Sequence, residues 1–445
     1  MSRPNILFMI ADDHRRDAIG AMGDPTVQTP TMDKLAEDGT VFNNAYIMGG
    51  MSGAVCVPSR ACVHTGVNIF GTSMTREPGT GGLGTLRPEL ATLAGTFRDA
   101  GYDTFATGKW HNDKTSFHKG FSHGANIFFG GMSNHLKVPI QQYDPTGEYA
   151  NNRRVIGDGF STDLFSDAAI EFLDNHDGGN PFFLYLSFTS PHDPRMAPAP
   201  YDAMYPPEEI PVPPNFMPMH SFDNGEMRIR DENLAPFPRT PEIVQQHISD
   251  YYAMITHQDA HMARVLEALE RSGQAENTIV VYTADHGLGV GQHGLLGKQN
   301  LYDHSVCVPC FLRGPGVPAG QRIDSLVYSY DLFPTLCDLT EIAIPNTVES
   351  SSLAPLIAGE KTPVRNSVYS AYRHIQRMVR AGDWKLIRYP EAGQTQLFNV
   401  EEDPWETRNL ADDPQFAAIR RSLNHELHGW MQQIDDPIKD LPALQ

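Results

Sequence analysis

Five short segments rich in apolar and strand-forming residues are spread along the chain, and they limit its fold more than any other feature. They are NILFMIA (5–11), DTFATG (103–108), PFFLYLSF (181–188), TIVVYTAD (278–285) and VPCFLRG (308–314). Because they lack strict polar-apolar alternation, we predict central strands buried on both faces. Helical patterns lie between them, at 29–39, 88–101, 160–176 and 242–273. This alternation predicts an α/β fold: a large, mostly parallel sheet flanked by helices.

Polar side chains stand where several of the predicted strands end. They are Asp12, Asp13, Lys109, His192, Asp285 and His286. In parallel sheets, ligands bind just outside the carboxyl ends of the strands. We therefore expect these residues to mark one site, although they are far apart in the sequence.

The pattern changes after about residue 346. Polar and apolar residues then alternate as in antiparallel strands, and a helix is expected at about 415–434. We predict a large α/β domain over 1–345 and a smaller C-terminal α+β domain with an antiparallel sheet over 346–445. The proline-rich stretch 191–241 begins beside His192, so we expect it to run over the surface next to the site, with a plain linker as the alternative.

The net charge narrows the classes of partner. The chain has 445 residues and a formal net charge of −20. Nucleic-acid-binding domains usually present a basic surface, so we expect no nucleic-acid partner. An anionic substrate would have to be held by a local positive site, because the field of the whole protein repels it.

Five cysteines, an odd and small number, do not predict a disulfide framework. Cys307 and Cys310 form a C-x-x-C pair in an apolar segment, so burial in a strand is favoured over a redox pair. No apolar run approaches the length of a membrane span, and the N-terminal apolar run is only about five residues long and ends in two aspartates, so it is shorter than the core of a signal peptide. We expect a cytoplasmic protein without a membrane partner, with a trimmed exported form as the alternative.

Two pairs of adjacent side chains could bind a metal. Asp12 and Asp13 are neighbouring carboxylates, which repel each other unless a positive group binds them. Hard divalent cations such as calcium or magnesium take such oxygen ligands. Asp285 and His286 end another predicted strand in the same way. Either pair alone would fit an ordinary surface loop, but two pairs at strand ends of one sheet favour a cation site.

The segment AVCVPSRACVHTG (54–66) contains two of the five cysteines. Pro58 suits the first turn of a helix, which places Cys56 near a helix N-terminus, where partial positive charge favours anions. Arg60 follows one turn later. A buried packing cysteine and a reactive thiol of low pKa are both open at this point, and neither explains the whole string.

The string CVPSRACVHTG resembles the sulfatase signature Cys-x-Pro-Ser-Arg-x-x-x-x-Thr-Gly. Other segments resemble that family in the same order, from about residue 4 to residue 413: PNILFMIADDHRRDAIGAMG, GYDTFATGKWH, SPHDP, TADHGLGVGQHGLLGK and DWKLIRY. The resemblance implies an alkaline-phosphatase-like fold and a sulfuric ester hydrolase that acts on a carbohydrate or aryl sulfate.

The resemblance also implies a modification and a metal. A formylglycine-generating maturation enzyme would oxidise Cys56 to an aldehyde, whose hydrate attacks the sulfur of a sulfate ester. The second hydroxyl of the hydrate then lets sulfate leave without attack of water on sulfur. One divalent cation would be present, calcium first, with magnesium and manganese as alternatives. Its implied ligands are Asp12, Asp13, Cys56 after conversion, Asp285 and His286.

The same resemblance assigns the remaining catalytic roles. Arg60 would hold the hydrate, and Lys109 and Lys298 would bind the sulfate oxygens. His111 would accept the second hydroxyl proton, and His192 would protonate the leaving alkoxide. These cations would let an acidic protein hold a small sulfated substrate.

Several histidines depart from the family pattern or lie near its motifs. His286 replaces a common asparagine, and imidazole suits softer cations, which leaves the metal open. His64 replaces an apolar residue and is interpreted as a harmless change on a helix face. For the loop histidines beside Lys298, His293 and His304, ordinary hydrogen bonds are favoured over substrate contact. His257 and His261 have a spacing that can hold zinc but lack a Glu-x-x-His context, so they are interpreted as structural or substrate-facing.

Three features have competing interpretations. Arg76 and Arg195 are candidates for substrate contact because they lie in loops beside motifs. The G-x-G-x-x-G string at 289–294 could indicate a dinucleotide site, but no ribose-binding acid follows, so a flexible loop that carries Lys298 to the site is favoured. The alternatives to a sulfatase are a phosphonate monoester or phosphodiester hydrolase with the same site, a non-enzymatic sulfated-glycan binder with unoxidised Cys56, and a nucleotide-dependent oxidoreductase.

Overall fold

The computed structural model describes residues 3–73, 84–439 and 441–442. Its main sheet has nine strands among these residues. In spatial order they are β10 (Cys307–Val308), β2 (Thr40–Tyr46), β11 (Cys310–Arg313), β9 (Thr278–Ala284), β1 (Asn5–Ala11), β8 (Phe182–Ser187), β4 (Asp103–Lys109) and β5 (His123–Phe128), and β12 (Gln321–Tyr328) pairs with β2.

Five neighbouring strands, β9, β1, β8, β4 and β5, run parallel, while β11 is antiparallel to both of its neighbours. The register brings Ile10 beside Ser187 on one side and Thr283 on the other. Every residue of β1, β8 and β9 is buried, as their uninterrupted apolar sequences require. The predicted α/β fold with a mostly parallel sheet is confirmed.

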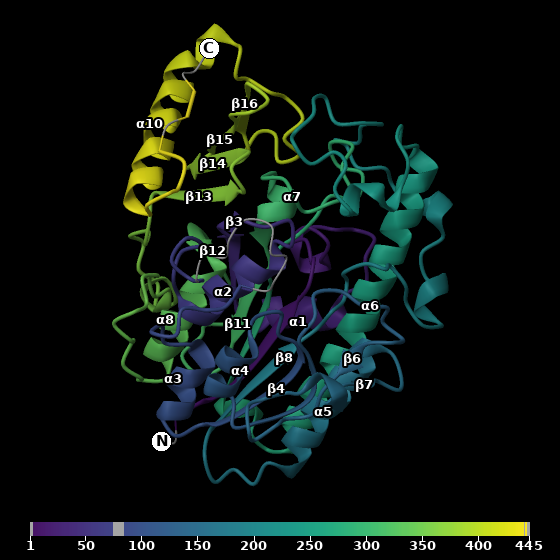
Figure 1. The fold of residues 1–445 in the computed structure, drawn as a ribbon, viewed down its shortest axis with the longest axis vertical. Coiled ribbons are helices and arrows are strands. Elements are labelled where there is room, and N and C mark those ends of the chain that lie inside the picture. Colours follow the sequence, from purple (N-terminus) through teal and green to yellow (C-terminus); the bar gives the residue numbers. More distant parts are fainter. Residues whose placement is uncertain (1–2, 74–83, 440, 443–445) are drawn as a thin grey trace.

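Two layers of helices cover this sheet (Figure 1). One contains α1 (Pro30–Glu37), α5 (Ser161–Asn175) and the long α6 (Pro241–Arg271); the other contains α2 (Cys56–Thr65), α3 (Leu93–Asp99) and α8 (Leu332–Leu339). Helix α6 starts as its sequence predicts: the Thr240 side chain accepts a hydrogen bond from the Ile243 N–H, and Pro241 occupies the first turn.

A second sheet of five strands lies at the upper end of the molecule in Figure 1. It contains β13 (Ser367–Tyr372), β14 (Gln376–Ala381), β15 (Trp384–Tyr389) and β16 (Gln394–Asn399), joined antiparallel, and α10 (Ala417–Gln433) packs on β14 and β15. The C-terminal antiparallel sheet and helix are confirmed. The fifth strand, β3 (Gly49–Gly50), comes from the N-terminal part and pairs parallel with β13. The domain boundary at residue 346 stays a prediction.

The other elements are short. They are α4 (Lys114–Gly120), α7 (Asp303–Val306), α9 (Ala354–Ile357), the two-stranded sheet of β6 (Pro139–Ile140) and β7 (Val155–Ile156), and 3-10 turns at Gly20–Met22, Asn151–Arg153, Tyr201–Ala203, Pro207–Glu209, Asp231–Leu234, Ala275–Asn277, Ser329–Asp331 and Pro414–Phe416.

The sequence pattern did not identify β2, β5 and β12, because polar residues interrupt them. In β2 these residues bond to β12: Asn43 Nδ2 donates to Asp324 Oδ1 at 2.6 Å, and Asn44 Nδ2 donates to the Asp324 carbonyl oxygen at 2.8 Å. In β2, side-chain hydrogen bonds to β12 therefore take the place of the uninterrupted apolar sequence of the central strands.

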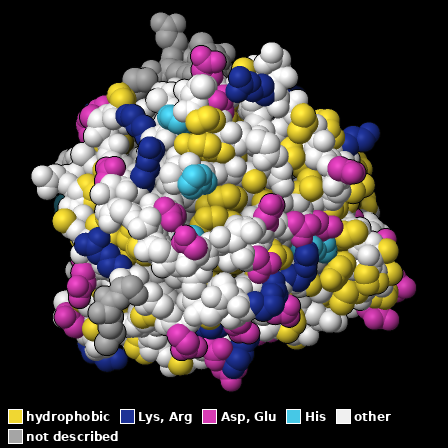
Figure 2. All heavy atoms as spheres, turned by 90° about the horizontal axis from the view of Figure 1, so that it is seen from below, with side chains coloured by type: hydrophobic (Ala, Val, Ile, Leu, Met, Phe, Trp, Pro, Cys, Tyr) yellow, Lys and Arg dark blue, Asp and Glu magenta, His cyan; other side chains and the backbone are white. Residues whose placement is uncertain are grey.

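The lower face of the molecule, seen in Figure 2, mixes acidic, basic and hydrophobic side chains. The net charge of −20 is therefore not matched by a uniformly acidic surface on this side. Across the described part of the chain, every helix is too short or too polar to span a bilayer.

Candidate active site

The carboxyl ends of β9, β1, β8 and β4 lie next to one another, because these strands are consecutive in the sheet. Backbone bonds hold the chain just beyond them: Asp12 N–H donates to the Ser190 carbonyl at 3.1 Å, and Asp285 N–H donates to the Ala11 carbonyl at 3.1 Å. The predicted site residues beyond these strands are therefore brought together, as the fold class predicted.

Helix α2 places Cys56 over these strand ends. The helix begins at Cys56 and ends at Gly66, which has a φ of 66° and donates to the Cys62 carbonyl at 2.8 Å. Ser59 Oγ donates to the Asp285 carbonyl at 2.5 Å, which ties the first turn to the end of β9. Cys56 is thus at a helix N-terminus, as predicted.

Arg60 braces three strand ends from inside the protein. Its Nε donates to Asp285 Oδ2 at 2.7 Å, and its Nη1 donates to the Lys109 carbonyl at 3.0 Å and to Ser187 Oγ at 2.6 Å. Burial opposes its charge, but the Asp285 carboxylate raises the pKa of Arg60 overall. Arg60 is therefore a fixed cation in the structural framework of the site.

The two lysines and two histidines of the site are held by the aspartates. Lys109 forms an ion pair with Asp12. Asp13 lies among three nitrogen-bearing side chains: Lys298 Nζ is 2.9 Å from its Oδ1, His286 Nδ1 is 3.1 Å from Oδ1, and His192 Nε2 is 3.8 Å from Oδ2. Lys298 Nζ also lies 3.5 Å from Cys56 Sγ. All ten predicted site residues are at most 5 % exposed.

Burial and the neighbouring charges together shift the acid–base properties of this cluster. Burial alone would raise the pKa of the Cys56 thiol, but Lys109, Lys298 and His286 lower it well below the usual range. Burial and Asp285 raise the pKa of Asp12. Burial would lower the pKa of His286, but Asp285 and Asp13 raise it to about 9. The site therefore strongly favours an anion at residue 56.

The same residues fit a divalent cation. Asp12 Oδ1 and His286 Nε2 are buried without a hydrogen-bond partner among the described residues. One ligand atom each from Asp12, Cys56, Asp285 and His286 lie within 4.8 Å of one another, and so do those of Asp12, Asp13, Cys56 and His192. Each group contains two carboxylates, which suit a hard cation such as calcium or magnesium. The predicted metal ligands are thus brought together, with His192 close to them.

His111 approaches Cys56 from the end of β4. It adopts a φ of 59°, and Asp13 a φ of 68°, two uncommon backbone conformations that cluster at functional sites. Burial and the Lys109 charge lower the pKa of His111 to about 4, so its imidazole is neutral at pH 7 and can accept a proton. A Cβ on Gly131 would stand 2.4 Å from His111 Nε2, which explains the glycine there.

His192 is held by residues that the sequence did not identify. Its Nδ1 lies 2.7 Å from the Asp193 carbonyl oxygen, and His135 Nε2 lies 2.9 Å from the His192 carbonyl oxygen. Arg230 binds both carboxylate oxygens of Asp193, with Nη2 at 2.9 Å from Oδ1. Arg230 could have been suspected because it lies inside the stretch 191–241, which was predicted to flank the site. His135 lies in a stretch without a recognisable pattern.

The loop before Lys298 is tied to the proline-rich stretch. Glu232 accepts hydrogen bonds from the Leu296 N–H at 3.0 Å and the Gly297 N–H at 2.9 Å. Gln299 Nε2 donates to Asp231 Oδ2 at 2.7 Å. The prediction that 191–241 flanks the site, and that this loop brings Lys298 to it, is confirmed.

Close packing explains the glycine string in this loop. A Cβ on Gly291 would lie 2.4 Å from Val244 Cγ1, and a Cβ on Gly294 would lie 2.5 Å from the Met219 carbonyl carbon. Glycine is therefore required by neighbouring chain segments, independently of any nucleotide.

The remaining candidates have structural partners. His64 stacks on Trp110 with ring centroids 4.0 Å apart, and His293 stacks on Tyr302 at 3.8 Å. Arg195 Nη1 lies 2.8 Å from His247 Nδ1. Cys307 and Cys310 are free, buried thiols on β10 and β11, and His304 is buried beside Tyr302. Arg76 lies outside the described residues.

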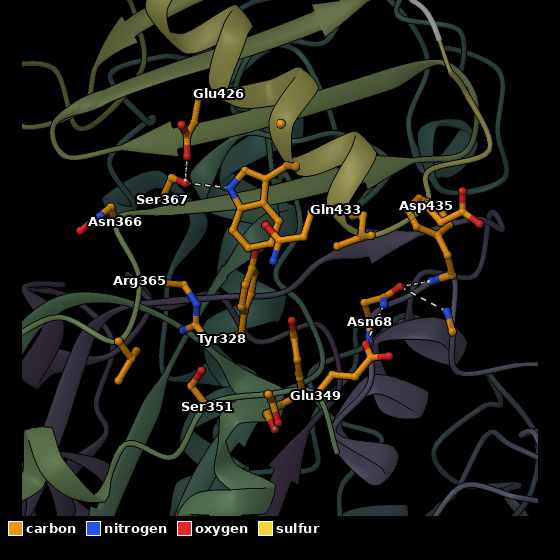
Figure 3. Close-up of a pocket in the computed structure, with 18 of the residues that line it drawn as sticks. Asn68, Tyr328, Glu349, Ser351, Arg365, Asn366, Ser367, Glu426, Gln433 and Asp435 are labelled. Carbon is orange, nitrogen blue, oxygen red and sulfur yellow. Dashed lines mark hydrogen bonds between the residues drawn. The ribbon is translucent and has the colours of Figure 1, made fainter. Parts of the chain in front are cut away.

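A cavity of about 860 Å³ lies elsewhere, between α10 and the catalytic part of the molecule (Figure 3). Tyr328, Arg365 and Trp430 are among its lining residues, and none of the ten predicted site residues lines it. We place the chemistry at the strand ends because the charged side chains converge there.

Known proteins match both the main part of the chain and its C-terminal part. Residues 4–342 match the family described as Sulfatase, and residues 291–433 match the C-terminal part described for N-sulphoglucosamine sulphohydrolase. The chain is 27 % identical to an N-acetylglucosamine-6-O-sulfatase of Bacteroides thetaiotaomicron, covering 98 % of this chain and 87 % of that protein.

Two solved structures are similar over almost their whole length. One is a protein in complex with its substrate D-glucosamine-2-N,6-O-disulfate, with a TM-score of 0.82, 25 % identity, and coverage of 99 % of this chain and 100 % of that one. The other is the phosphonate monoester hydrolase of Agrobacterium radiobacter, with a TM-score of 0.77, 22 % identity, and coverage of 97 % and 96 %. The second likeness concerns the fold alone.

Proposed function

The chain belongs to the sulfatase family and is a sulfuric ester hydrolase, and we propose that it removes sulfate from a sulfated sugar through a formylglycine formed at Cys56. The observation that supports this proposal most strongly is the position of Cys56 at the start of α2. Lys298 Nζ lies 3.5 Å from its Sγ, and a cluster of candidate cation ligands lies beside it. A similar structure that holds a glucosamine disulfate supports a sugar sulfate over an aryl sulfate.

The proposal includes two additions to the chain: a maturation enzyme that converts Cys56, and a divalent cation. Asp12, Asp13, residue 56, Asp285 and His286 would hold the cation. When bound, it would supply Lewis-acid polarisation of the nucleophile and of a sulfate oxygen. The oxygen-rich ligand set favours calcium, with magnesium and manganese as alternatives.

The side chains around residue 56 would each act on a separate atom of the substrate or nucleophile. Lys109 and Lys298, held in place by Asp12 and Asp13, would bind sulfate oxygens as charge builds on them. Neutral His111 would accept a proton from the nucleophile. Arg60 would keep the strand ends and α2 in register.

His192 would donate a proton to the leaving alkoxide. Burial lowers its pKa, and the carboxylates of Asp13 and Asp193 act in the opposite direction. Its ring and carbonyl are held by Asp193 and His135, so the proton can be directed to one position.

The alternative activity is hydrolysis of a phosphonate monoester or phosphodiester at the same site, favoured only by the shared fold of a phosphonate monoester hydrolase. The deciding experiment compares kcat/KM on a glucosamine 6-O-sulfate, on 4-nitrophenyl sulfate and on a phenyl phosphonate monoester. We expect the sugar sulfate to be the best substrate. A higher kcat/KM on the phosphonate would reverse the assignment.

Substitution of the nucleophile gives the second test. Cys56→Ala should lower kcat by at least about 10³-fold, because removing a nucleophile eliminates the covalent step. Cys62→Ala is the matched control, since Cys62 is a buried cysteine of the same helix and belongs to neither group of candidate cation ligands at the site. Wild-type turnover by Cys56→Ala would end the formylglycine mechanism for this protein.

A further inference from the structure

Three metal-ligating side chains converge between α5 and α6, outside the site described above. His257 and His261 lie one turn apart on α6, and Asp163 lies in the first turn of α5. His257 Nε2 is 3.0 Å and His261 Nε2 is 3.1 Å from the same atom, Asp163 Oδ1. None of the three residues belongs to the catalytic cluster.

Ordinary hydrogen bonding leaves this arrangement incomplete. Asp163 Oδ1 is a buried oxygen that both imidazoles approach within hydrogen-bond distance, so two rings share one acceptor atom. His257 Nδ1 is likewise buried without a partner among the described residues. The two imidazole rings have centroids 4.6 Å apart and an interplanar angle of 70°, and both Nε2 atoms approach Asp163 Oδ1.

The distances match those between ligands of a tetrahedral metal ion. With bonds of about 2.0–2.1 Å to nitrogen and oxygen, neighbouring ligand atoms in a tetrahedral zinc site stand about 3.3 Å apart. The three side-chain ligand atoms here lie within 4.8 Å of one another. Small side-chain adjustments would therefore be enough to admit an ion.

We propose that Asp163, His257 and His261 form a second metal site, which binds Zn²⁺ or a similar late first-row divalent ion. Two imidazole nitrogens and one carboxylate oxygen are ligands that zinc prefers over calcium. The Asp163 side chain is 38 % exposed, which leaves a path for the ion and a fourth position for water. The bound ion would fasten the first turn of α5 to α6.

Arg264 and the metal ion would compete for His261. Its Nη1 donates to His261 Nδ1 at 3.0 Å, and its Nη2 donates to Asp167 Oδ1 at 2.7 Å. While His261 Nδ1 accepts this bond, the ring proton of the neutral imidazole is on Nε2, the atom that must bind the metal. Metal binding therefore requires Arg264 to turn away, and its side chain, 46 % exposed, is free to keep only the Asp167 contact.

The test is Zn²⁺ titration of the calcium-saturated full-length enzyme, by calorimetry and by competition with a fluorescent zinc chelator. We expect wild type to bind one Zn²⁺ ion at this site and to show a higher Tm when it is bound. His261→Gln and Asp163→Asn should lose that ion and the Tm increase. Arg264→Gln should bind it several-fold more tightly, a gain that a merely structural role of the histidines does not predict.

Two further variants locate the ion. His425→Gln, which changes an exposed histidine of α10, should bind Zn²⁺ like wild type. Asp13→Asn, which alters the catalytic cluster, should also retain the ion. Equal zinc binding by wild type and His261→Gln, loss of the ion in Asp13→Asn alone, or no binding by either wild type or Arg264→Gln would overturn the proposal.

Discussion

Arg230 acts on the site through Asp193 and does not contact Cys56. Its guanidinium binds both Asp193 carboxylate oxygens, and one of these lies 3.3 Å from His192 Nδ1. The Arg230 side chain is 43 % exposed, so its loss should not open the core. We therefore regard Arg230 as a positioning residue for the group that protonates the leaving alkoxide.

Arg230→Gln should slow hydrolysis most for esters of poor leaving groups. A sugar alkoxide needs a proton as it leaves, whereas 4-nitrophenolate does not, so kcat should fall about 10–10²-fold on a sugar sulfate and little on 4-nitrophenyl sulfate. Arg228→Gln, at an exposed neighbouring position, is the control. An equal loss on both substrates would show that Arg230 only supports the fold.

At the residue scale, the sequence was sufficient to identify those site residues that lie together in short contiguous motifs. Cys56 and Arg60 share one helical turn, and Asp12, Asp13, Asp285 and His286 follow strands directly. His135, Arg230 and Glu232 could not be identified, because their roles arise from tertiary hydrogen bonds to His192, Asp193 and the Lys298 loop.

Strand β4 ends at Lys109, and a glycine directly before this lysine lets β4 pack closely against β8. Gly108, the residue before Lys109, has a φ of 92°, and a Cβ there would lie 1.8 Å from the Ser187 carbonyl oxygen of β8. Gly101 has a similar φ of 91°, but a Cβ there would meet nothing within 4 Å. Substitution of Gly101 would therefore introduce backbone strain alone, whereas substitution of Gly108 would add a steric clash between β4 and β8.

Gly101→Ala should lower the free energy of unfolding by about 1–2 kcal/mol, the cost of positive φ for an L-residue. Gly108→Ala should lower it by at least about 3 kcal/mol, because β4 and β8 must also separate. Urea unfolding of both variants measures the difference. Equal losses would mean that β8 moves aside without cost, contrary to the packing described here.

At the element scale, buried central strands and long helices could be predicted because their apolar patterns depend on burial alone. Strands β1, β4, β8 and β9 are of this kind. The two-residue strand β3 could not, because its two glycines carry no side-chain pattern and its partner β13 is more than 300 residues away.

The whole molecule is joined across its two sheets by buried charges. Lys385 of β15 reaches Asp303 at 2.8 Å and Glu406 at 2.7 Å, and the Asp303 N–H donates to Glu406 Oε2 at 2.8 Å. Asp303 opens α7 in the catalytic part, so this cluster connects the C-terminal sheet to the chain that follows Lys298. Burial, with Asp303 adding and Lys385 opposing, raises the pKa of Glu406 to about 7.

A raised carboxyl pKa makes this connection pH-dependent. The folded state binds the Glu406 proton more tightly than the unfolded state does. The contribution of Glu406 to the free energy of unfolding is therefore fully present below about pH 4.5 and is lost as the pH rises through about 7. The decline attributable to Glu406 is about 3 kcal/mol. Glu406→Gln should remove it, so that the variant gains on wild type between pH 4.5 and pH 8.

Chemical unfolding of wild type, Glu406→Gln and the exposed control Glu401→Gln across this range measures the effect. Parallel pH profiles for wild type and Glu406→Gln would contradict the raised pKa. At this scale the sequence predicted both sheets, but not the charged contact between them, because Lys385, Asp303 and Glu406 lie in segments without a shared motif.

The central claim is that Cys56 is converted to formylglycine and serves as the nucleophile. The most direct measurement is the mass of the proteolytic peptide that contains residue 56, taken from protein made in a host with the maturation enzyme. We predict the mass of the aldehyde or its hydrate in place of the thiol. An intact thiol, while a second sulfatase in the same cells is converted, would contradict the account.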